Sequence, residues 1–138
     1  MGQAAIYLSL HKGCEVFTTV GTPEKRKFIR DTFPSIPEGH IGNSRDTSLE
    51  QMVLQQTKDR GVDIVLNSLA EEKLQASICC LTRDGCFLEI RKVDFLSDNL
   101  LDLSILSKEI KFFGVLLDNV FLASDEVKTY VQGVDKIM

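Results

Sequence analysis

The stretch Val16-Phe17-Thr18-Thr19-Val20-Gly21-Thr22-Pro23-Glu24-Lys25-Arg26 decides the fold of this chain. Its first five residues are apolar or β-branched, as in a buried strand, and Gly21 ends the run. Proline is favoured in the first turn of a helix, so a helix is expected to begin at Pro23. The stretch therefore predicts a strand, a tight turn and a helix, the unit from which parallel α/β sheets are built.

The same alternation of strand and helix continues along the rest of the chain. Strands are predicted at Cys14–Val20, His40–Asn43, Val62–Leu66, Phe87–Ile90 and Ile110–Leu117. Helices are predicted at Gly2–Lys12, Pro23–Phe33, Leu49–Gln56, Glu71–Leu81, Leu100–Leu106 and Asp125–Val134, and the run Thr47-Ser48-Leu49-Glu50 matches a capping box. This order predicts an α/β fold, a three-layer Rossmann-like parallel sheet with helices on both faces.

Composition limits the classes of protein to which the chain can belong. With 138 residues, 43% of them hydrophobic, it can form one domain with a core, and 1–138 is taken as that domain. A net charge of −4 offers no basic surface for nucleic acid, and no apolar run approaches the roughly 18 residues of a membrane span. The expectation is a soluble, cytoplasmic protein that binds neither nucleic acid nor membrane.

The cysteines and histidines carry no metal-binding pattern. Four cysteines lie in apolar segments without Cys-x-x-Cys spacing, which favours reduced core thiols over disulfides or zinc: Cys14, Cys79, Cys80 and Cys86. His11 and His40 stand at the ends of elements and are given no role. No metal site is predicted.

Two cations follow the strand that ends at Val20. In a dinucleotide-binding fold, residues at this strand end contact the adenosine ribose. An acidic residue there would accept a hydrogen bond from the 2′-hydroxyl of NAD. Here Thr22 is followed by Lys25 and Arg26, which suit a 2′-phosphate and predict NADPH as the cofactor. The alternative is an ordinary solvated first turn of an amphipathic helix.

The start of the chain looks like the tail of a glycine-rich phosphate loop. A dinucleotide fold opens with a strand and G-x-G-x-x-G, whereas this sequence opens with Met1-Gly2-Gln3-Ala4-Ala5. Gly2 and Gln3 are the cofactor-binding residues expected to remain from that loop. The first strand is expected to be missing from between its neighbours, which would leave the strand edges at Val16–Val20 and Val62–Leu66 with unpaired backbone groups and exposed apolar side chains.

Several sequence runs together resemble one known enzyme family. The runs are Gly2–Ile6, Val16–Gly21, Glu24–Arg26, Asn43–Ser48, Gly61–Ser77, Phe87–Ile90 and Gly114–Asp118. They resemble the nucleotide-binding half of the enoyl reductase domain of animal fatty acid synthase, a member of the zinc-independent medium-chain dehydrogenase/reductase family. The resemblance extends to about Val131 and implies a partial NADP-binding Rossmann domain.

The resemblance also implies a reaction and partners. The expected reaction is hydride transfer from NADPH to a trans-2-enoyl thioester held on an acyl carrier protein, within a synthase that contributes other domains. The family carries a lysine and an aspartate in sequence runs that match Lys92 and Asp118 here. The resemblance implies that Lys92 donates a proton, and that Asp118 either orients the Lys92 side chain or relays the proton. Arg91 departs from the family, which has glycine there. A loop-surface lysine and a helix-capping aspartate are the structural alternatives.

Residues at other strand ends have weaker claims on the cofactor. Asn67 and Ser68 could contact the nicotinamide ribose, and Leu88, Glu89 and Ile90 could place backbone groups beside the nicotinamide. Arg45 could stack on adenine or reach a phosphate. The alternative for Asn67 and Ser68 is an ordinary strand-to-helix turn. For the residues around Leu88 it is a plain buried strand, and for Arg45 it is a surface loop.

Two further functions compete with a fatty acid enoyl reductase. Reducing polyketide synthases carry a related domain, and the chain could equally be a non-catalytic fragment or scaffold remnant. Because a reductase also needs its substrate half and its glycine loop, the chain alone is expected to be inactive.

Overall fold

A computed structural model of the chain describes residues 2–69, 72–90 and 107–115. The chain divides into two compact units, one formed by Met1–Val16 with Leu116–Met138 and the other by Phe17–Val115. In the first unit, helix α1 spans Gly2–His11 and buries Ile6. Gly13 adopts a φ of +74° just after this helix, the left-handed conformation that commonly ends one.

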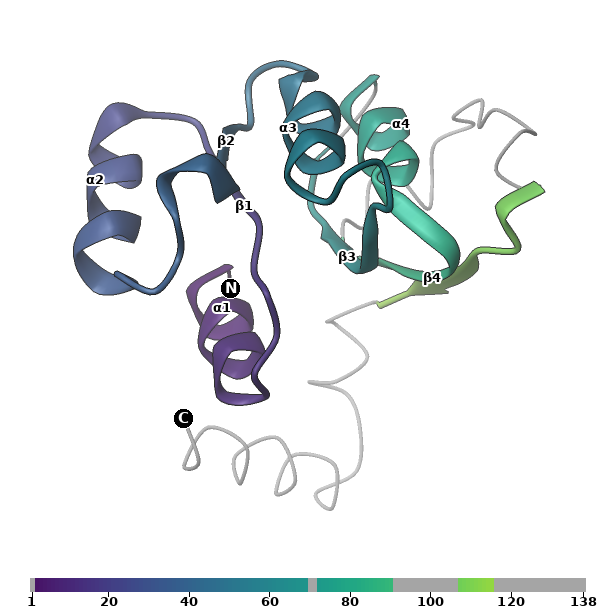
Figure 1. The fold of residues 1–138 in the computed structure, drawn as a ribbon, viewed down its shortest axis with the longest axis horizontal. Coiled ribbons are helices and arrows are strands. Elements are labelled where there is room, and N and C mark those ends of the chain that lie inside the picture. Colours follow the sequence, from purple (N-terminus) through teal and green to yellow (C-terminus); the bar gives the residue numbers. More distant parts are fainter. Residues whose placement is uncertain (1, 70–71, 91–106, 116–138) are drawn as a thin grey trace. The chain divides into compact units, whose positions relative to one another are not determined.

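The second unit alternates strands and helices in the predicted order (Figure 1). Its elements are β1 (Thr18–Val20), α2 (Pro23–Thr32), the short 3₁₀ helix η1 (Glu38–His40), β2 (Ile41–Asn43), α3 (Ser48–Gln56), β3 (Val62–Asn67), α4 (Glu72–Cys79), β4 (Leu81–Glu89) and β5 (Lys111–Gly114). All strand pairs are parallel. The predicted Rossmann-like α/β fold is confirmed. The helices expected at Leu100–Leu106 and Asp125–Val134 lie outside the described residues.

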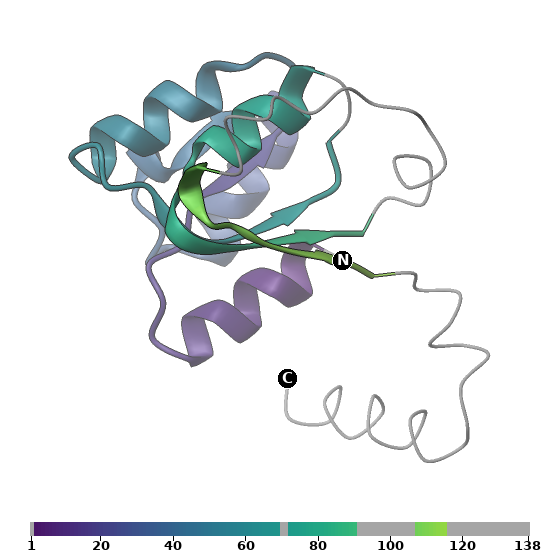
Figure 2. The same ribbon diagram turned by 90° about the vertical axis from the view of Figure 1, so that its right-hand side faces the viewer.

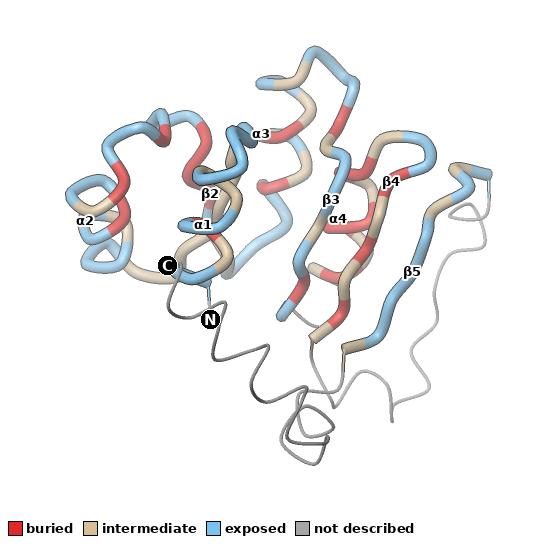
Figure 3. The backbone as a smooth tube through the Cα atoms, turned by 90° about the horizontal axis from the view of Figure 1, so that it is seen from below, coloured by how far each residue is buried: buried red, intermediate tan, exposed pale blue. Residues whose placement is uncertain are grey.

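The strands form two separate sheets. One has the order β1-β2 and the other β3-β4-β5, so β1 and β3 are not paired with each other, as predicted. Two apolar side chains of β3 are also exposed, Ile64 by 63% and Leu66 by 44%, and β5 is exposed along its length (Figure 3). The expected exposure of apolar side chains is thus confirmed at Val62–Leu66, whereas Val16–Val20 are half-buried.

Strand β4 begins much earlier than the sequence pattern predicts. A helix was expected through Leu81 and a strand only from Phe87, but α4 ends at Cys79 and β4 runs from Leu81. Val62 pairs with Leu81, whereas Ile64 pairs with Cys86, so the register shifts between these pairs. Asp84 has a φ of +60° in the shifted segment, a backbone conformation that strand periodicity does not reveal.

Helix α4 lies along one face of β3 and β4 (Figure 2). Leu74 and Ile78 of this helix form a buried cluster with Leu81 and Phe87, and the Phe87 ring stacks on Phe112 of β5 with centroids 5.0 Å apart. A second buried cluster joins α3 to α4 through Leu49, Val53, Ala76 and Cys80. These clusters pack α3 and α4 against each other and α4 against β3 and β4.

The approach of the chain to β3 depends on Gly61. This buried residue has a φ of +83°, and a Cβ there would stand 2.5 Å from the Cys80 carbonyl oxygen. That separation is far below any normal contact, and the obstacle is backbone, which cannot rotate away. Only glycine fits where β3 starts beside the end of α4.

The predicted capping box at the start of α3 does not form. Thr47 occupies the N-cap position, but its side chain makes no capping hydrogen bond. Asp46 caps the helix instead, because its Oδ1 accepts a hydrogen bond from the Ser48 backbone N–H at 2.9 Å. Hydrogen bonds from the Ser48 hydroxyl and backbone N–H lower the pKa of Asp46 below its usual value.

The four cysteines are free thiols in different environments. Cys80 is buried, Cys79 and Cys86 are half-buried and Cys14 is exposed, so the prediction of a core thiol is wrong for Cys14. Burial raises the pKa of the Cys80 thiol to about 12. Among the described residues, no helix is both long enough and apolar enough to cross a membrane.

Candidate nucleotide-binding site

Most of the predicted site residues that the structure describes lie at or just after the carboxyl ends of the parallel strands. Thr22, Lys25, Arg26 and Arg45 follow β1 and β2 and are called the β1–β2 end below. Asn67, Ser68, Glu89 and Ile90 finish or follow β3 and β4 and are called the β3–β4 end. This edge is where ligands bind in open α/β sheets. Gly2 and Gln3 lie exposed in the first turn of α1, in the other unit.

Thr22 begins α2 and orders its first turn. Its Oγ1 accepts a hydrogen bond from the Lys25 backbone N–H at 3.3 Å, and Pro23 occupies the first turn, as predicted. Hydrogen bonds from its own backbone N–H and from the Thr22 hydroxyl lower the pKa of Glu24. The turn therefore has a fixed backbone, from which Lys25 extends into solvent.

The Arg26 guanidinium is held by other residues of the chain. Its Nη1 pairs with the Glu38 carboxylate, and its Nη2 donates a hydrogen bond to the Ile41 backbone carbonyl. Glu38 also pairs with Arg30, with 3.4 Å between Nε and Oε2. These contacts tie α2 to η1 and to the start of β2. Contact between Arg26 and a cofactor phosphate remains a prediction.

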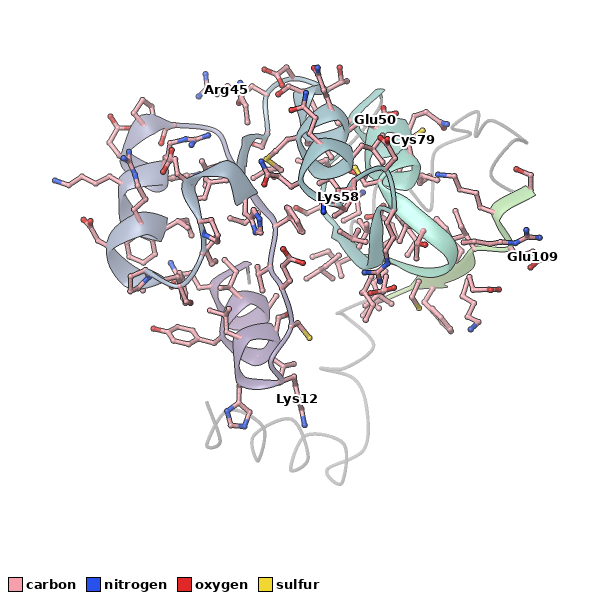
Figure 4. All side chains as sticks on the ribbon, viewed as in Figure 1. Lys12, Arg45, Glu50, Lys58, Cys79 and Glu109 are labelled. Atoms are coloured by element: carbon pink, nitrogen blue, oxygen red, sulfur yellow. The ribbon has the colours of Figure 1, made fainter. Side chains whose placement is uncertain are left out.

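Lys25 and Arg45 are the exposed cations of the β1–β2 end. Arg45 extends outward from the segment between β2 and α3 (Figure 4). A Cβ added to Gly21 would lie 3.5 Å from the Arg45 Nε, so the Arg45 side chain passes beside the end of β1. Within the described ranges, neither Lys25 nor Arg45 forms an ion pair with a carboxylate. Both are available to an anionic ligand.

Asn43 fixes the backbone from which Arg45 extends. Its Oδ1 accepts a hydrogen bond from the Arg45 backbone N–H at 3.0 Å, and its Nδ2 donates to Asp46 Oδ2 at 2.7 Å. The Ser44 backbone N–H donates to the Val20 carbonyl at 3.0 Å, which joins this turn to the end of β1. The turn is thereby held beside the ribose position expected at the end of β1.

The β3–β4 end is built on a buried hydrogen bond between Asn67 and Glu89. The Asn67 Nδ2 lies 2.6 Å from Glu89 Oε2 and 2.8 Å from the Leu69 carbonyl oxygen, so both amide hydrogens have acceptors. The Asn67 Oδ1 accepts from the Leu69 backbone N–H at 3.3 Å. The side chain of Asn67 is therefore occupied inside the protein, and Ser68 beside it is exposed.

The side chain of Glu89 was missed as a site residue by the sequence reasoning. Only 1% of Glu89 is exposed, although it stands at the carboxyl edge of the sheet. A signal was present, because a glutamate within the apolar run Cys86–Ile90 cannot be buried without hydrogen-bond partners. Leu88 and Ile90, the other predicted backbone contacts, are both half-buried next to it.

The residues proposed for proton transfer are not placed by the structure. Lys92, Asp118 and the departure from the family at Arg91 lie outside the described residues, and their roles remain predictions. In the part of the chain that the structure describes, no group of three or more His, Cys, Asp or Glu side chains could hold a metal ion.

A shallow hollow of about 580 Å³ runs along α3, away from the strand ends of β3 and β4. Its lining includes the acidic residues Asp46, Glu50 and Asp59. Three carboxylates would repel the phosphates of a dinucleotide. The hollow is therefore not part of the candidate site.

Comparison with known proteins places the chain in a family. Residues 1–136 match the family described as zinc-binding dehydrogenase. The nucleotide-binding subdomain of the enoylreductase domain of PpsC from Mycobacterium tuberculosis is 32% identical and superposes with a TM-score of 0.85. That similarity covers 98% of this chain and 74% of the solved one.

Curated relatives are much longer proteins. Highly reducing polyketide synthase frbB from Dothideomycetidae sp. (strain 11243) is 43% identical over 120 residues, which cover 87% of this chain and 4% of the synthase. Squalestatin tetraketide synthase from Phoma sp. (strain C2932) is 38% identical over 138 residues, 100% of this chain and 5% of that protein. These relatives are polyketide synthases, not the animal fatty acid synthase first expected.

The fold, the strand-end residues and these similarities agree. The chain belongs to the zinc-binding dehydrogenase family and, within it, to the nucleotide-binding subdomains of enoyl reductase type.

Proposed function

We propose that this chain is the NADPH-binding part of an enoyl reductase within a reducing polyketide synthase. The observation that carries the proposal is the similarity of nearly the whole chain to the nucleotide-binding subdomain of an enoylreductase domain. Similarity to polyketide synthases over most of the chain supports the type of synthase. The substrate would be a trans-2-enoyl thioester on an acyl carrier protein, delivered among the synthase's other domains.

The exposed cations of the β1–β2 end support NADPH as the cofactor. Lys25 and Arg45 are exposed just after the strand ends where a dinucleotide ribose is read, and within the described ranges neither forms an ion pair with a carboxylate. An arginine fork and a lysine ammonium suit the 2′-phosphate of NADPH. Arg26 supports this site from behind, by joining α2 to β2.

The chemistry divides between the cofactor and the chain. Bound NADPH supplies a hydride to the β-carbon of the enoyl thioester. The protein must then protonate the α-carbon and stabilise negative charge on the thioester oxygen. We assign proton donation to Lys92, and to Asp118 either the orientation of Lys92 or the relay of the proton. Ser68, Leu88 and Ile90 are proposed to line the nicotinamide side. Gly2 and Gln3 are proposed to contact the pyrophosphate.

Two other functions remain as alternatives. The sequence runs Gly61–Ser77 and Gly114–Asp118 resemble animal fatty acid synthase, whose enoyl reductase would perform the same reaction on a growing fatty acid. A non-catalytic scaffold is the other alternative. Analysis of the product made by the complete polypeptide distinguishes a fatty acid synthase from a polyketide synthase. Absence of NADPH oxidation with any enoyl thioester would favour the non-catalytic scaffold.

The cofactor assignment is tested by neutralising the two exposed cations. In the complete polypeptide that contains this chain, Lys25→Gln with Arg45→Gln should weaken NADPH binding about 10- to 100-fold, because charge-assisted hydrogen bonds to the 2′-phosphate are lost. Binding of NADH should change little. Fluorescence titration with each cofactor measures both affinities.

Lys27 supplies the control for this change in charge. It is an exposed lysine on α2, two residues beyond Lys25, so Lys27→Gln removes a similar charge from the same helix. The control should leave the preference for NADPH intact. Equal losses for NADPH and NADH in the double variant would contradict the assignment.

The proton-transfer assignment is tested at Lys92. Lys92→Ala should lower turnover of an enoyl thioester by about 100- to 10,000-fold, as expected for loss of a general acid, and leave NADPH affinity nearly unchanged. Asp118→Ala should act in the same direction. Arg91→Gly restores the family glycine and shows whether that departure limits turnover. Full activity of a Lys92→Ala, Asp118→Ala double variant would overturn both assignments.

A further inference from the structure

The hydrogen bond between Asn67 and Glu89 joins the last residues of two neighbouring parallel strands. These residues are direct partners in the β3–β4 register, and their side chains are 2% and 1% exposed. The Nδ2 to Oε2 distance of 2.6 Å is short for a hydrogen bond to a carboxylate. The contact spans 22 residues of sequence, so it orders the two strand ends relative to each other.

The same two residues also fix the backbone on either side of the contact. The Asn67 side chain closes a turn onto Leu69 through both its carbonyl and its amide, and that turn contains Ser68. The Asn67 backbone carbonyl accepts from the Ile90 N–H at 3.2 Å, and the Glu89 carbonyl accepts from the Val115 N–H at 2.7 Å. The pair therefore ties the ends of β3, β4 and β5 together.

A buried carboxylate is a costly way to hold strands together. Burial of a charge is opposed by desolvation, and a well-packed apolar pair often gives equal or greater stability. The clusters under α4 already supply apolar packing to β3 and β4. The polar pair provides something that apolar packing lacks, a fixed hydrogen-bond geometry at the edge where the ligand binds.

We propose that Asn67 and Glu89 are positioning residues for hydride transfer. By fixing Ser68 and Ile90, they hold the surface against which the nicotinamide lies at the angle and distance that the reaction requires. This inference rests on the proposed function. It predicts that weakening the pair slows hydride transfer itself, with little effect on how tightly NADPH binds.

The test uses the complete polypeptide and the near-isosteric change Glu89→Gln. Glutamine keeps the volume and one acceptor oxygen but loses the charge, so kcat should fall about 10-fold while KM for NADPH stays within about 3-fold. The primary isotope effect on kcat, measured with NADPH deuterated at the transferred hydrogen, should rise. Loss of folded protein alone would lower kcat without changing the isotope effect.

Reversing the pair provides a rescue. Asn67→Asp places two carboxylates together and should lower kcat further, whereas Asn67→Asp with Glu89→Gln lets residue 89 donate to residue 67. Because aspartate at position 67 cannot donate to the Leu69 carbonyl, recovery should be partial, with kcat of the double variant above that of Asn67→Asp alone, a coupling that independent residues do not show. Additive losses would overturn the proposal. If Asn67→Asp alone does not fold, the Glu89→Gln result decides.

Leu74→Ala is the control for reduced stability. Leu74 is buried under the same sheet, so its loss destabilises the unit without touching the polar pair. Its isotope effect should equal that of the wild type. An unchanged isotope effect in Glu89→Gln, with an active wild type, overturns the positioning role alone. A wild type that does not oxidise NADPH with any enoyl thioester overturns the proposed function as well.

Discussion

Two asparagines end parallel strands in this protein, and each donates its side-chain amide to a carboxylate. Asn43 reaches Asp46 at 2.7 Å after β2, and Asn67 reaches Glu89 at 2.6 Å after β3. The first pair is exposed and three residues apart, whereas the second is buried and 22 residues apart. Nearly equal distances thus correspond to different tasks, because the first shapes a local turn and the second connects two strands.

The largest difference between the two ends is expected from converting each asparagine to aspartate. Asn67→Asp would bury two carboxylates in contact, and breaking a buried polar pair in this way should lower the free energy of unfolding by about 3–5 kcal/mol. Asn43→Asp should change it within experimental error, because water screens the exposed pair. Urea unfolding of both variants measures the difference. Similar losses would remove the distinction between the two ends.

A smaller difference is expected from adding one methyl group to Gly61, which directly precedes β3, or to Gly42, which lies in β2. Gly61→Ala meets the Cys80 backbone at 2.5 Å with a φ of +83°, and should cost about 2–4 kcal/mol. In β2, Gly42→Ala meets the flexible end of Met52, with 3.1 Å to its sulfur, and should cost about 1 kcal/mol. Thermal unfolding checks the order. A larger loss at Gly42 would show that Met52 cannot move.

The smallest effects are expected at the two extremes of pH. The raised pKa of Cys80 keeps its thiol protonated in the folded state, so stability from this group is complete below the unfolded pKa and declines above about pH 8.5. The slope is at most about 1.4 kcal/mol per pH unit. Cys80→Ala should remove that slope, and Cys14→Ala, at an exposed thiol, should not.

At acid pH we expect a loss of the stability that Asp46 contributes between β2 and α3. The pKa of Asp46 is lowered, so its contribution is present above the unfolded pKa and is lost as pH falls through the folded value. Ser48→Ala removes the hydroxyl that contributes most to this shift, and should raise the Asp46 pKa measured by NMR titration. An unchanged titration would contradict the hydrogen bond from the Ser48 hydroxyl to Asp46.

Local patterns in the sequence predicted most of the elements. The helix at Pro23 begins where its proline indicates, and the strand Val62–Leu66 differs from β3 by one residue. Both depend on neighbouring residues. The early start of β4 could not be predicted, because the left-handed backbone at Asp84 interrupts its periodicity.

Contacts between distant residues explain what the sequence did not reveal about the site. The positions of Asn67 and Arg45 at strand ends follow from the parallel order of the strands. The partner of Asn67 depends on the β3–β4 register, and the partner of Arg26 lies 12 residues away at Glu38. A hydrophobic pattern contains neither relation.

The contacts of Arg26 have a consequence for mutational screens. Because its guanidinium joins α2 to Glu38 and to the Ile41 carbonyl, substitutions at Arg26 should lower the amount of intact protein in cells. A screen that scores product alone would rank Arg26 with Lys25 and Arg45. Measuring protein abundance beside product formation would separate Arg26 from the two exposed cations. Lys25 and Arg45 would then be the described positions at which we expect substitutions to change the proposed preference for NADPH without loss of folding.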